Sequence, residues 1–303
     1  MHARFVPEYA YYALGSALGL AARSLVSKAL VRYRICDSGL VTWGIGLAAG
    51  LLGGGVWLLL RPPFPWRAVW PILGVVATVQ AASWFVNRAI QEGDLSTVAP
   101  LLSVKIPMAA VLAFLLLGET YGPATYVAVG LAAAGAVLFG VGRPRPAQGG
   151  HGTPTVVAIL LACAGAAAFA MADQFAKLGL NRSEGLGFLL WTLMLRGAFC
   201  GVMIARPAYR RYRVTGLDWL LFLVGGGVTI GALGSLYRAF RVSDSVTLTN
   251  VILGMRGLFG LLVGATLGRL LRVPLESQPA RIYLLRAFGT GLLFLAILIA
   301  LTS

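Results

Sequence analysis

Long apolar stretches separated by short polar turns are the dominant pattern of this sequence. A membrane-spanning helix needs about 20 mostly apolar residues, and ten stretches have that length. Because lipid cannot pair with backbone N–H and C=O groups, each stretch is predicted to be a helix. The predicted spans are Tyr9–Val31, Leu40–Leu60, Val69–Ile90, Leu95–Leu117, Tyr121–Val141, Thr155–Leu178, Leu186–Ala205, Leu217–Arg238, Val246–Leu267 and Ile282–Leu301.

The second half of the sequence repeats the first. A shift of 150 residues places Asn87–Glu119 on Tyr237–Arg269 without a gap. Five spans per half is an odd number, so two copies enter the membrane in opposite orientations, as in many secondary transporters. The matched polar pairs are Arg88 with Arg238, Asp94 with Asp244 and Thr97 with Thr247.

The predicted architecture is an all-α integral membrane protein with ten transmembrane helices in two inverted five-helix repeats. The first repeat covers residues 1–142, and the second covers residues 155–303. Between them, residues 143–154 form a polar linker rich in proline and glycine, which is typical of a boundary.

Two motifs in the first half carry a resemblance to a known family. The segment Asp94–Pro100 (DLSTVAP) opens the fourth predicted span, and Leu117–Glu119 (LGE) closes it, followed by a span rich in glycine and alanine. This arrangement resembles the EamA-type members of the drug/metabolite transporter superfamily. The resemblance implies solute transport, but it leaves the substrate open. The second half departs from the motifs, with Asn250 in place of Pro100 and Arg269 in place of Glu119.

Composition agrees with a membrane protein. Hydrophobic residues make up 58% of the chain and charged residues 12%, whereas soluble domains contain about 25% charged residues. The net charge of +15 comes mainly from arginines in short predicted loops. Such residues signal topology and contact anionic lipid headgroups. We therefore expect membrane lipids as partners and no nucleic acid.

Several ionisable side chains lie deep inside predicted spans, where charge is costly and commonly functional. A purely structural alternative is that Asp173 is neutralised by Lys177, one helical turn away, or by Arg196, and this accounts for only one or two of the cations. Three cations are left without an acidic partner in the spans, which predicts a basic cavity that binds an anion. The deep charged residues are Lys105, Arg256, Arg23, Arg196 and Asp173.

A polar pocket is expected around these charges. Trp84 and Tyr237 are candidates to complete it, although both also suit the role of aromatic anchors at the membrane interface. The plastid sugar-phosphate carriers of the same superfamily place a lysine on the fourth helix and a basic pair on the ninth. Lys105 and Arg256 are similar to these residues in helix and depth, with Met255 at the remaining basic position. The predicted substrate-binding residues are Lys105, Arg256, Arg23, Arg196, Asp173, Trp84 and Tyr237.

The residues that most enzymes and metal sites use are missing from the predicted spans. His2 and His151 lie outside them, the deep carboxylate is single, and three isolated cysteines suggest no disulfide framework. We therefore expect no enzyme activity, cofactor or metal. The predicted function is transport of a small organic anion, phosphorylated or carboxylated, by alternating access. The alternatives are a flippase for an anionic lipid, and an amino-acid or drug exporter.

The predicted location is a bacterial inner membrane, with several spans; the oligomeric state is open, and a monomer fits. Loops on the side opposite the N-terminus contain more arginine and lysine than those on the N-terminal side. Taken literally, this bias puts both termini outside. The family resemblance implies termini in the cytoplasm, so the sequence leaves the orientation open.

Overall fold

The computed structural model describes residues 7–35, 37–92, 102–141, 156–209, 212–243, 245–256, 258–259, 262 and 280–302. Within these residues all regular structure is helical, and no strand is present. The α-helices are α1 (Glu8–Leu30), α2 (Ser38–Leu60), α3 (Val69–Glu92), α5 (Lys105–Leu117), α6 (Pro123–Val141), α7 (Val156–Leu180), α8 (Gly185–Ile204), α9 (Gly216–Val242), α10 (Val246–Leu253) and α12 (Ala280–Thr302). The short helical turns are Val31–Ile35, Trp66–Ala68, Leu102–Val104 and Pro207–Tyr209.

The helices lie where the apolar stretches predict them, so the all-α prediction is confirmed. Among the described residues, five stretches are long and apolar enough to cross a membrane, namely α2, the region from Trp66 to Ala89, α7, α8 and α9. The count of ten spans stays a prediction. The predicted linker at 143–154 lies outside the described residues, and so does the motif Asp94–Pro100.

The fourth and ninth predicted spans differ from the continuous helices that their apolar pattern indicates. The turn Leu102–Val104 precedes α5, so Lys105 is the first residue of that helix. In the second half, α10 ends at Leu253 and a turn at Gly254 and Met255 follows it. Residues 93–101 and 263–279 lie outside the described residues. Lys105 and Arg256 therefore both lie directly beside a helix interruption.

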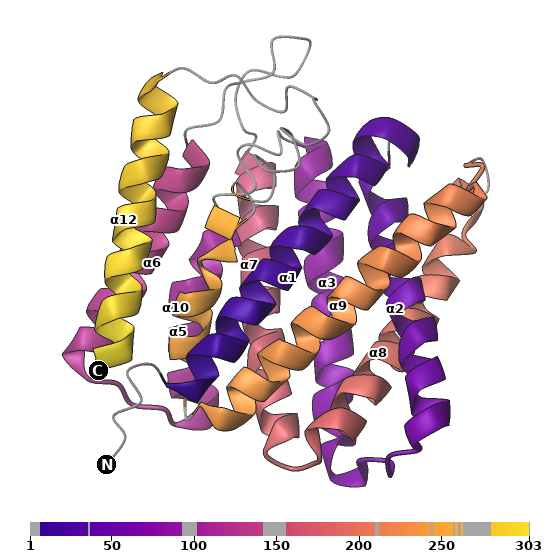
Figure 1. Cartoon of the computed structure of the whole chain (residues 1–303), viewed down its shortest axis with the longest axis horizontal. Helices are drawn as coiled ribbons and strands as arrows, with labels where there is room; N and C mark the ends of the chain where they lie inside the picture. Colours follow the sequence, from indigo (N-terminus) through magenta and orange to yellow (C-terminus); the bar gives the residue numbers. More distant parts are fainter. Residues whose placement is uncertain are drawn as a thin grey trace.

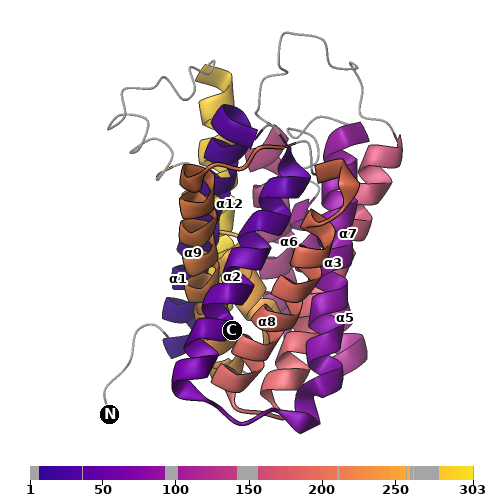
Figure 2. The same cartoon turned by 90° about the vertical axis from the view of Figure 1, so that its right-hand side faces the viewer.

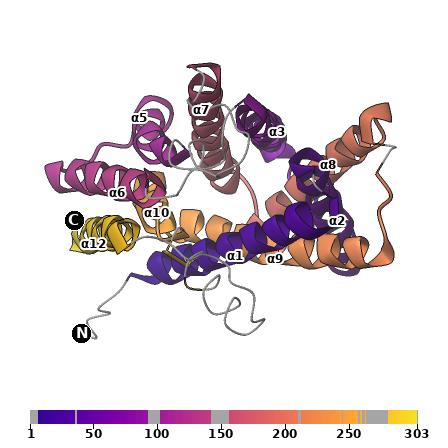
Figure 3. The ribbon, with the colours of Figure 1, turned by 90° about the horizontal axis from the view of Figure 1, so that it is seen from above.

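Most helix packing joins the first half of the chain to the second. The main pairs are α1 with α9, α2 with α8, α3 with α7, and α6 with α12. Seen from above, α1 and α9 line one side of the bundle and α5, α7 and α3 the other (Figure 3). The α6/α12 pair closes one end, and the α2/α8 pair closes the end that Figure 2 faces.

Contacts between loops fix the directions of the helices. After α1, Arg34 donates from Nε to Oδ1 of Asp218, near the start of α9, at 2.9 Å; we name this side the Arg34 face. On the opposite side, named the Arg67 face, residues 63–67 after α2 share a cleft with residues 182–184 after α7. Because α1 ends on the Arg34 face and α7 on the Arg67 face, these two helices run in opposite directions (Figure 1).

Small residues allow the helices of different halves to approach closely. A β-carbon added at Gly19 of α1 would lie 2.8 Å from Cβ of Ala232 on α9. One added at Gly50 of α2 would lie 2.5 Å from Cα of Gly197 on α8. Glycine at such contacts permits tight packing where no hydrophobic effect drives the helices together.

Candidate substrate-binding site between the two halves

Lys105 and Asp173 form an ion pair between α5 and α7. Nζ of Lys105 lies 2.7 Å from Oδ2 of Asp173, and the side chains are 24% and 9% exposed. The expectation that Lys105 has no acidic partner in the spans is therefore wrong. The pairing depends on the packing of α5 against α7, a contact between distant segments that the pattern within either span does not reveal.

Lys177 caps the end of α9. Its ammonium donates hydrogen bonds to the carbonyl oxygens of Phe240 and Ser243, at 2.6 and 2.5 Å. The last carbonyls of a helix lack partners within the helix, and a cation there also favours the helix dipole. A structural role thus accounts for this buried lysine, which the sequence suggested as a neutralising partner for Asp173.

Arg23, Arg196 and Arg256 gather in one region between the halves. They come from α1, from α8 and from the segment after α10, and the positive charges of Arg196 and Arg256 both act on Arg23. Nε of Arg23 and Nε of Arg196 are buried without a hydrogen-bond partner. Among the described residues none of the three is ion-paired. Arg196 is buried, Arg23 is partly buried and Arg256 is exposed. A buried cation is unfavourable unless water or an anion reaches it.

A glycine on α2 makes room for Arg196. A β-carbon added at Gly46 would lie 2.5 Å from Sγ of Cys200 and 4.0 Å from Nε of Arg196. Gln80 of α3 donates from Nε2 to Sγ of Cys200 at 3.4 Å, while its Oε1 has no partner. The helices α2, α3 and α8 thus surround a buried guanidinium, thiol and amide.

A hydroxyl on α1 holds Arg256. Nη2 of Arg256 donates to Oγ of Ser24 at 2.7 Å, and that hydroxyl donates to the carbonyl oxygen of Leu20 at 2.9 Å. Ser24 follows Arg23 directly, so the contact fixes Arg256 beside the other cations. The sequence analysis missed Ser24, whose only signal was its position next to a deep arginine.

The two helix interruptions meet each other. A β-carbon added at Gly254, after α10, would lie 3.5 Å from Cδ1 of Ile106 in the first turn of α5. Ile106 and Met255 belong to one buried apolar cluster. Lys105 and Arg256 therefore stand on neighbouring segments from different halves. Their side chains nevertheless take different partners, Asp173 and Ser24.

Tyr237 lies within this region. It is 5% exposed on α9 and packs against Phe188, with ring centroids 5.4 Å apart. The charges of Asp173 and Arg196 both act on its hydroxyl, so Tyr237 lies near both residues. Trp84 is different, because it is 52% exposed and its described ring contact is with Phe85. No described contact joins Trp84 to the charged residues, and its exposure suits the anchor role.

Further buried polar atoms inside the bundle have no partner in the protein. They are Oγ of Ser16, Nδ2 of Asn87 and Oε1 of Gln174. Buried polar groups are normally hydrogen-bonded. Several buried polar atoms without protein partners therefore indicate that water or a polar ligand forms hydrogen bonds with them. Ser16 and Gln174 were not singled out from the sequence, because a single serine or glutamine in an apolar span gives no distinctive pattern.

These features define the class of the protein. An all-helical chain with several apolar helices of spanning length is an integral, multi-pass membrane protein. Residues 8–141 match the model of the EamA-like transporter family. This part of the chain is thus similar to the EamA-like transporter family, and the match supports the resemblance carried by the motifs at 94–100 and 117–119. This family comprises transporters rather than enzymes.

A solved crystal structure has the same fold. The alignment covers 97% of this chain and 98% of the other, with a TM-score of 0.72 and 16% sequence identity. At that identity the likeness shows the fold alone. A comparison with curated protein sequences found no match.

Proposed function

We propose that this protein moves a small organic anion, phosphorylated or carboxylated, across the membrane. The observation that carries the proposal is the group formed by Arg23, Arg196 and Arg256, which has no acidic partner among the described residues. Asp173 and Arg196 both lie near Tyr237, and Asp173 is already neutralised by Lys105. The region therefore keeps about three positive charges for a ligand.

Arginine suits the proposed substrate. Its guanidinium binds carboxylate and phosphate through two parallel hydrogen bonds, and it keeps its charge when water is excluded. The unpaired Nε atoms of Arg23 and Arg196 offer donors for such contacts. Oε1 of Gln80, an unpaired acceptor close to Arg196 through Cys200, suits a hydroxyl on the same substrate.

We further propose that transport proceeds by alternating access between two inverted five-helix halves. The opposite directions of α1 and α7 support this, as does a pattern of helix pairs that is unchanged when the halves are exchanged. The meeting of two interrupted segments at Ile106 and Gly254 supports a binding site beside them, because many transporters bind substrate where helices are broken near the midplane. A bacterial inner membrane is the proposed location.

Uptake into proteoliposomes tests the proposal. Labelled sugar phosphates, nucleotide sugars, dicarboxylates and amino acids are offered to the wild type, to Arg256→Gln and to Arg238→Gln. Arg238 is the matched control, because it is an exposed arginine whose nearest acid, Glu8, is 3.9 Å away. We expect saturable uptake of an anion that falls about tenfold or more in Arg256→Gln and is unchanged in Arg238→Gln.

The panel also separates the alternatives. Equal uptake by the wild type and Arg256→Gln would overturn the anion site. Uptake of amino acids without any uptake of the anions would favour the alternative that the protein is an amino-acid exporter. Movement of a labelled anionic lipid between leaflets, with none of the soluble solutes carried, would favour a flippase.

A further inference from the structure

A second basic site lies on the Arg67 face, away from the region between the halves. Its cleft has a volume of about 260 Å³. Two segments form it, one after α2 and one after α7, so both halves contribute. The lining residues are Pro63, Phe64, Pro65, Trp66, Arg67, Arg182, Ser183, Glu184 and Gly187.

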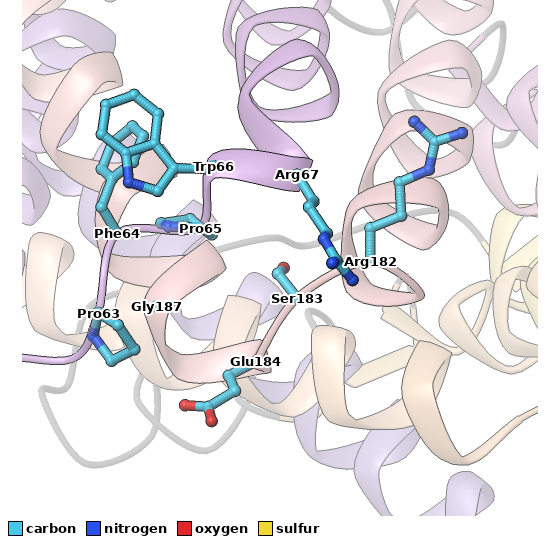
Figure 4. A pocket seen from close by; sticks show the side chains of 9 residues that line it. All are labelled: Pro63, Phe64, Pro65, Trp66, Arg67, Arg182, Ser183, Glu184 and Gly187. Atoms are coloured by element: carbon cyan, nitrogen blue, oxygen red, sulfur yellow. The ribbon is translucent and has the colours of Figure 1, made fainter.

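The cleft has a charged side and an aromatic side (Figure 4). Arg67 comes from one half and Arg182 from the other; in this view the Arg67 side chain ends near the base of Arg182, whose guanidinium points the other way, and the Glu184 carboxylate is turned away from both. Neither arginine has an ion-pair partner among the described residues. Both are exposed, so a ligand from outside the protein can reach them.

The aromatic side consists of packed rings with exposed tryptophans beside them. The rings of Phe64 and Trp66 are 4.5 Å apart, and Phe64 also packs on Trp191 at 4.6 Å. Trp66 is 78% exposed and Trp70 79% exposed. Tryptophans of this kind mark the boundary between hydrocarbon and water, where the segment between α2 and α3 must lie.

An apolar surface continues from the cleft toward the membrane interior. The last three residues of α2, Leu58, Leu59 and Leu60, are 62%, 84% and 59% exposed. Exposed leucine at the end of a membrane helix faces acyl chains. The cleft and its surroundings therefore combine two guanidinium groups without ion-pair partners, exposed tryptophans and exposed leucines. A ligand that fits all three has an anionic headgroup and apolar chains.

We propose that this cleft binds the phosphate headgroup of an anionic phospholipid, with Arg67 and Arg182 on the phosphate and the acyl chains along the end of α2. Basic pockets between membrane helices recognise anionic headgroups in this way. The bound lipid bridges the two halves on the Arg67 face, because each half supplies one arginine. The proposal does not depend on the transported substrate.

The test measures lipid-dependent stability of the purified full-length protein in a neutral detergent. Phosphatidylglycerol, phosphatidylcholine and soluble glycerol phosphate are titrated against the midpoint of thermal unfolding, and bound lipid is counted by native mass spectrometry. We expect phosphatidylglycerol to raise the midpoint and to be retained, whereas the zwitterionic lipid and the soluble phosphate leave both unchanged.

Matched charge variants locate the effect. Arg67→Gln/Arg182→Gln removes two charges at the cleft, and Arg206→Gln/Arg213→Gln removes two exposed charges from the segment before α9, on the Arg34 face. The first variant is expected to need about tenfold more phosphatidylglycerol for the same shift, and the second is expected to behave as the wild type. If the first double variant does not fold, each single variant is titrated instead, with a partial loss expected.

Three results would overturn the proposal. The first is an equal shift with both lipids, and the second is an equal loss in both double variants. The third is a shift with soluble glycerol phosphate as large as that with lipid, which would assign the cleft to a free phosphate compound.

Discussion

Lys105 and Arg256 stand at related places in the two halves, and the protein treats their charges differently. Lys105 begins α5 and is paired with Asp173 at 2.7 Å. Arg256 follows α10, and its partner among the described residues is the hydroxyl of Ser24, with the charge of Arg23 nearby. One position is neutral within the protein, and the other keeps its charge available. The packing of the helices is symmetric between the halves, and the placement of charge is where the halves differ.

The largest expected effect comes from breaking the paired site. Lys105→Met leaves the Asp173 carboxylate buried without a partner, which costs about 3–5 kcal/mol of unfolding free energy. Adding Asp173→Leu removes the orphaned charge, so the double variant should recover most of that loss. Denaturation in detergent, arranged as a double-mutant cycle, measures both values. Additive single effects would show that the two side chains are not coupled.

The unpaired site should respond in the opposite way. Arg196→Gln removes a buried cation that has no protein partner, so stability should stay the same or rise, while anion uptake falls about a hundredfold. Proteoliposome uptake and thermal unfolding of the same preparation supply the two numbers. A large loss of stability in this variant would mean that Arg196 supports the fold rather than a ligand.

The space for Arg196 gives a smaller, local test. Gly46→Ala would bring Cβ to 2.5 Å from Sγ of Cys200, and overpacking of this kind costs about 1–3 kcal/mol. The matched control is Gly55→Ala on the same helix, where an added β-carbon meets nothing within 4 Å. That control should be neutral or stabilising by about 0.5 kcal/mol. Similar unfolding midpoints for both variants would contradict the packing at Gly46.

The smallest effect is expected at an exposed ion pair. Arg238 lies 3.9 Å from Glu8, with side chains 53% and 43% exposed. Solvent screens such pairs, so Arg238→Gln should change the free energy of unfolding by less than about 0.5 kcal/mol. Compared with Lys105→Met, this variant separates the effect of burial from the effect of pairing.

The sequence predicted the helices well because the signal for a span is carried by composition within one segment. The stretches rich in glycine and alanine and the motifs at 94–100 and 117–119 are local patterns, and the repeat at a shift of 150 residues can be read directly by comparing two segments of the sequence. The deep cations were also found by this route, since a lysine or arginine inside an apolar span stands out. Arg196 and Arg256 both lie near Arg23, while the anion site that they were expected to form stays a prediction.

The partners of those cations were not predictable in the same way. That Asp173 pairs with Lys105 depends on α5 packing against α7. That Lys177 caps α9 depends on two carbonyl oxygens, those of Phe240 and Ser243, at the end of a helix far along the chain. Gly46 and Ser24 carry no signal of their own, because glycine and serine are common in membrane helices. The surface cleft at Arg67 and Arg182 joins two loops more than a hundred residues apart.

The pairing of helices across the halves has a consequence for biosynthesis. Because α1 packs on α9, α2 on α8 and α6 on α12, no helix of the first half has its main neighbour until the second half has been made. Contacts this distant in the chain form late and slowly. Until the second half is made, the first helices in the membrane lack their packing partners. Their small-residue surfaces and charged residues such as Arg23 are not yet in contact with the second half. Completion of the bundle depends on α12, the last described helix, reaching α6.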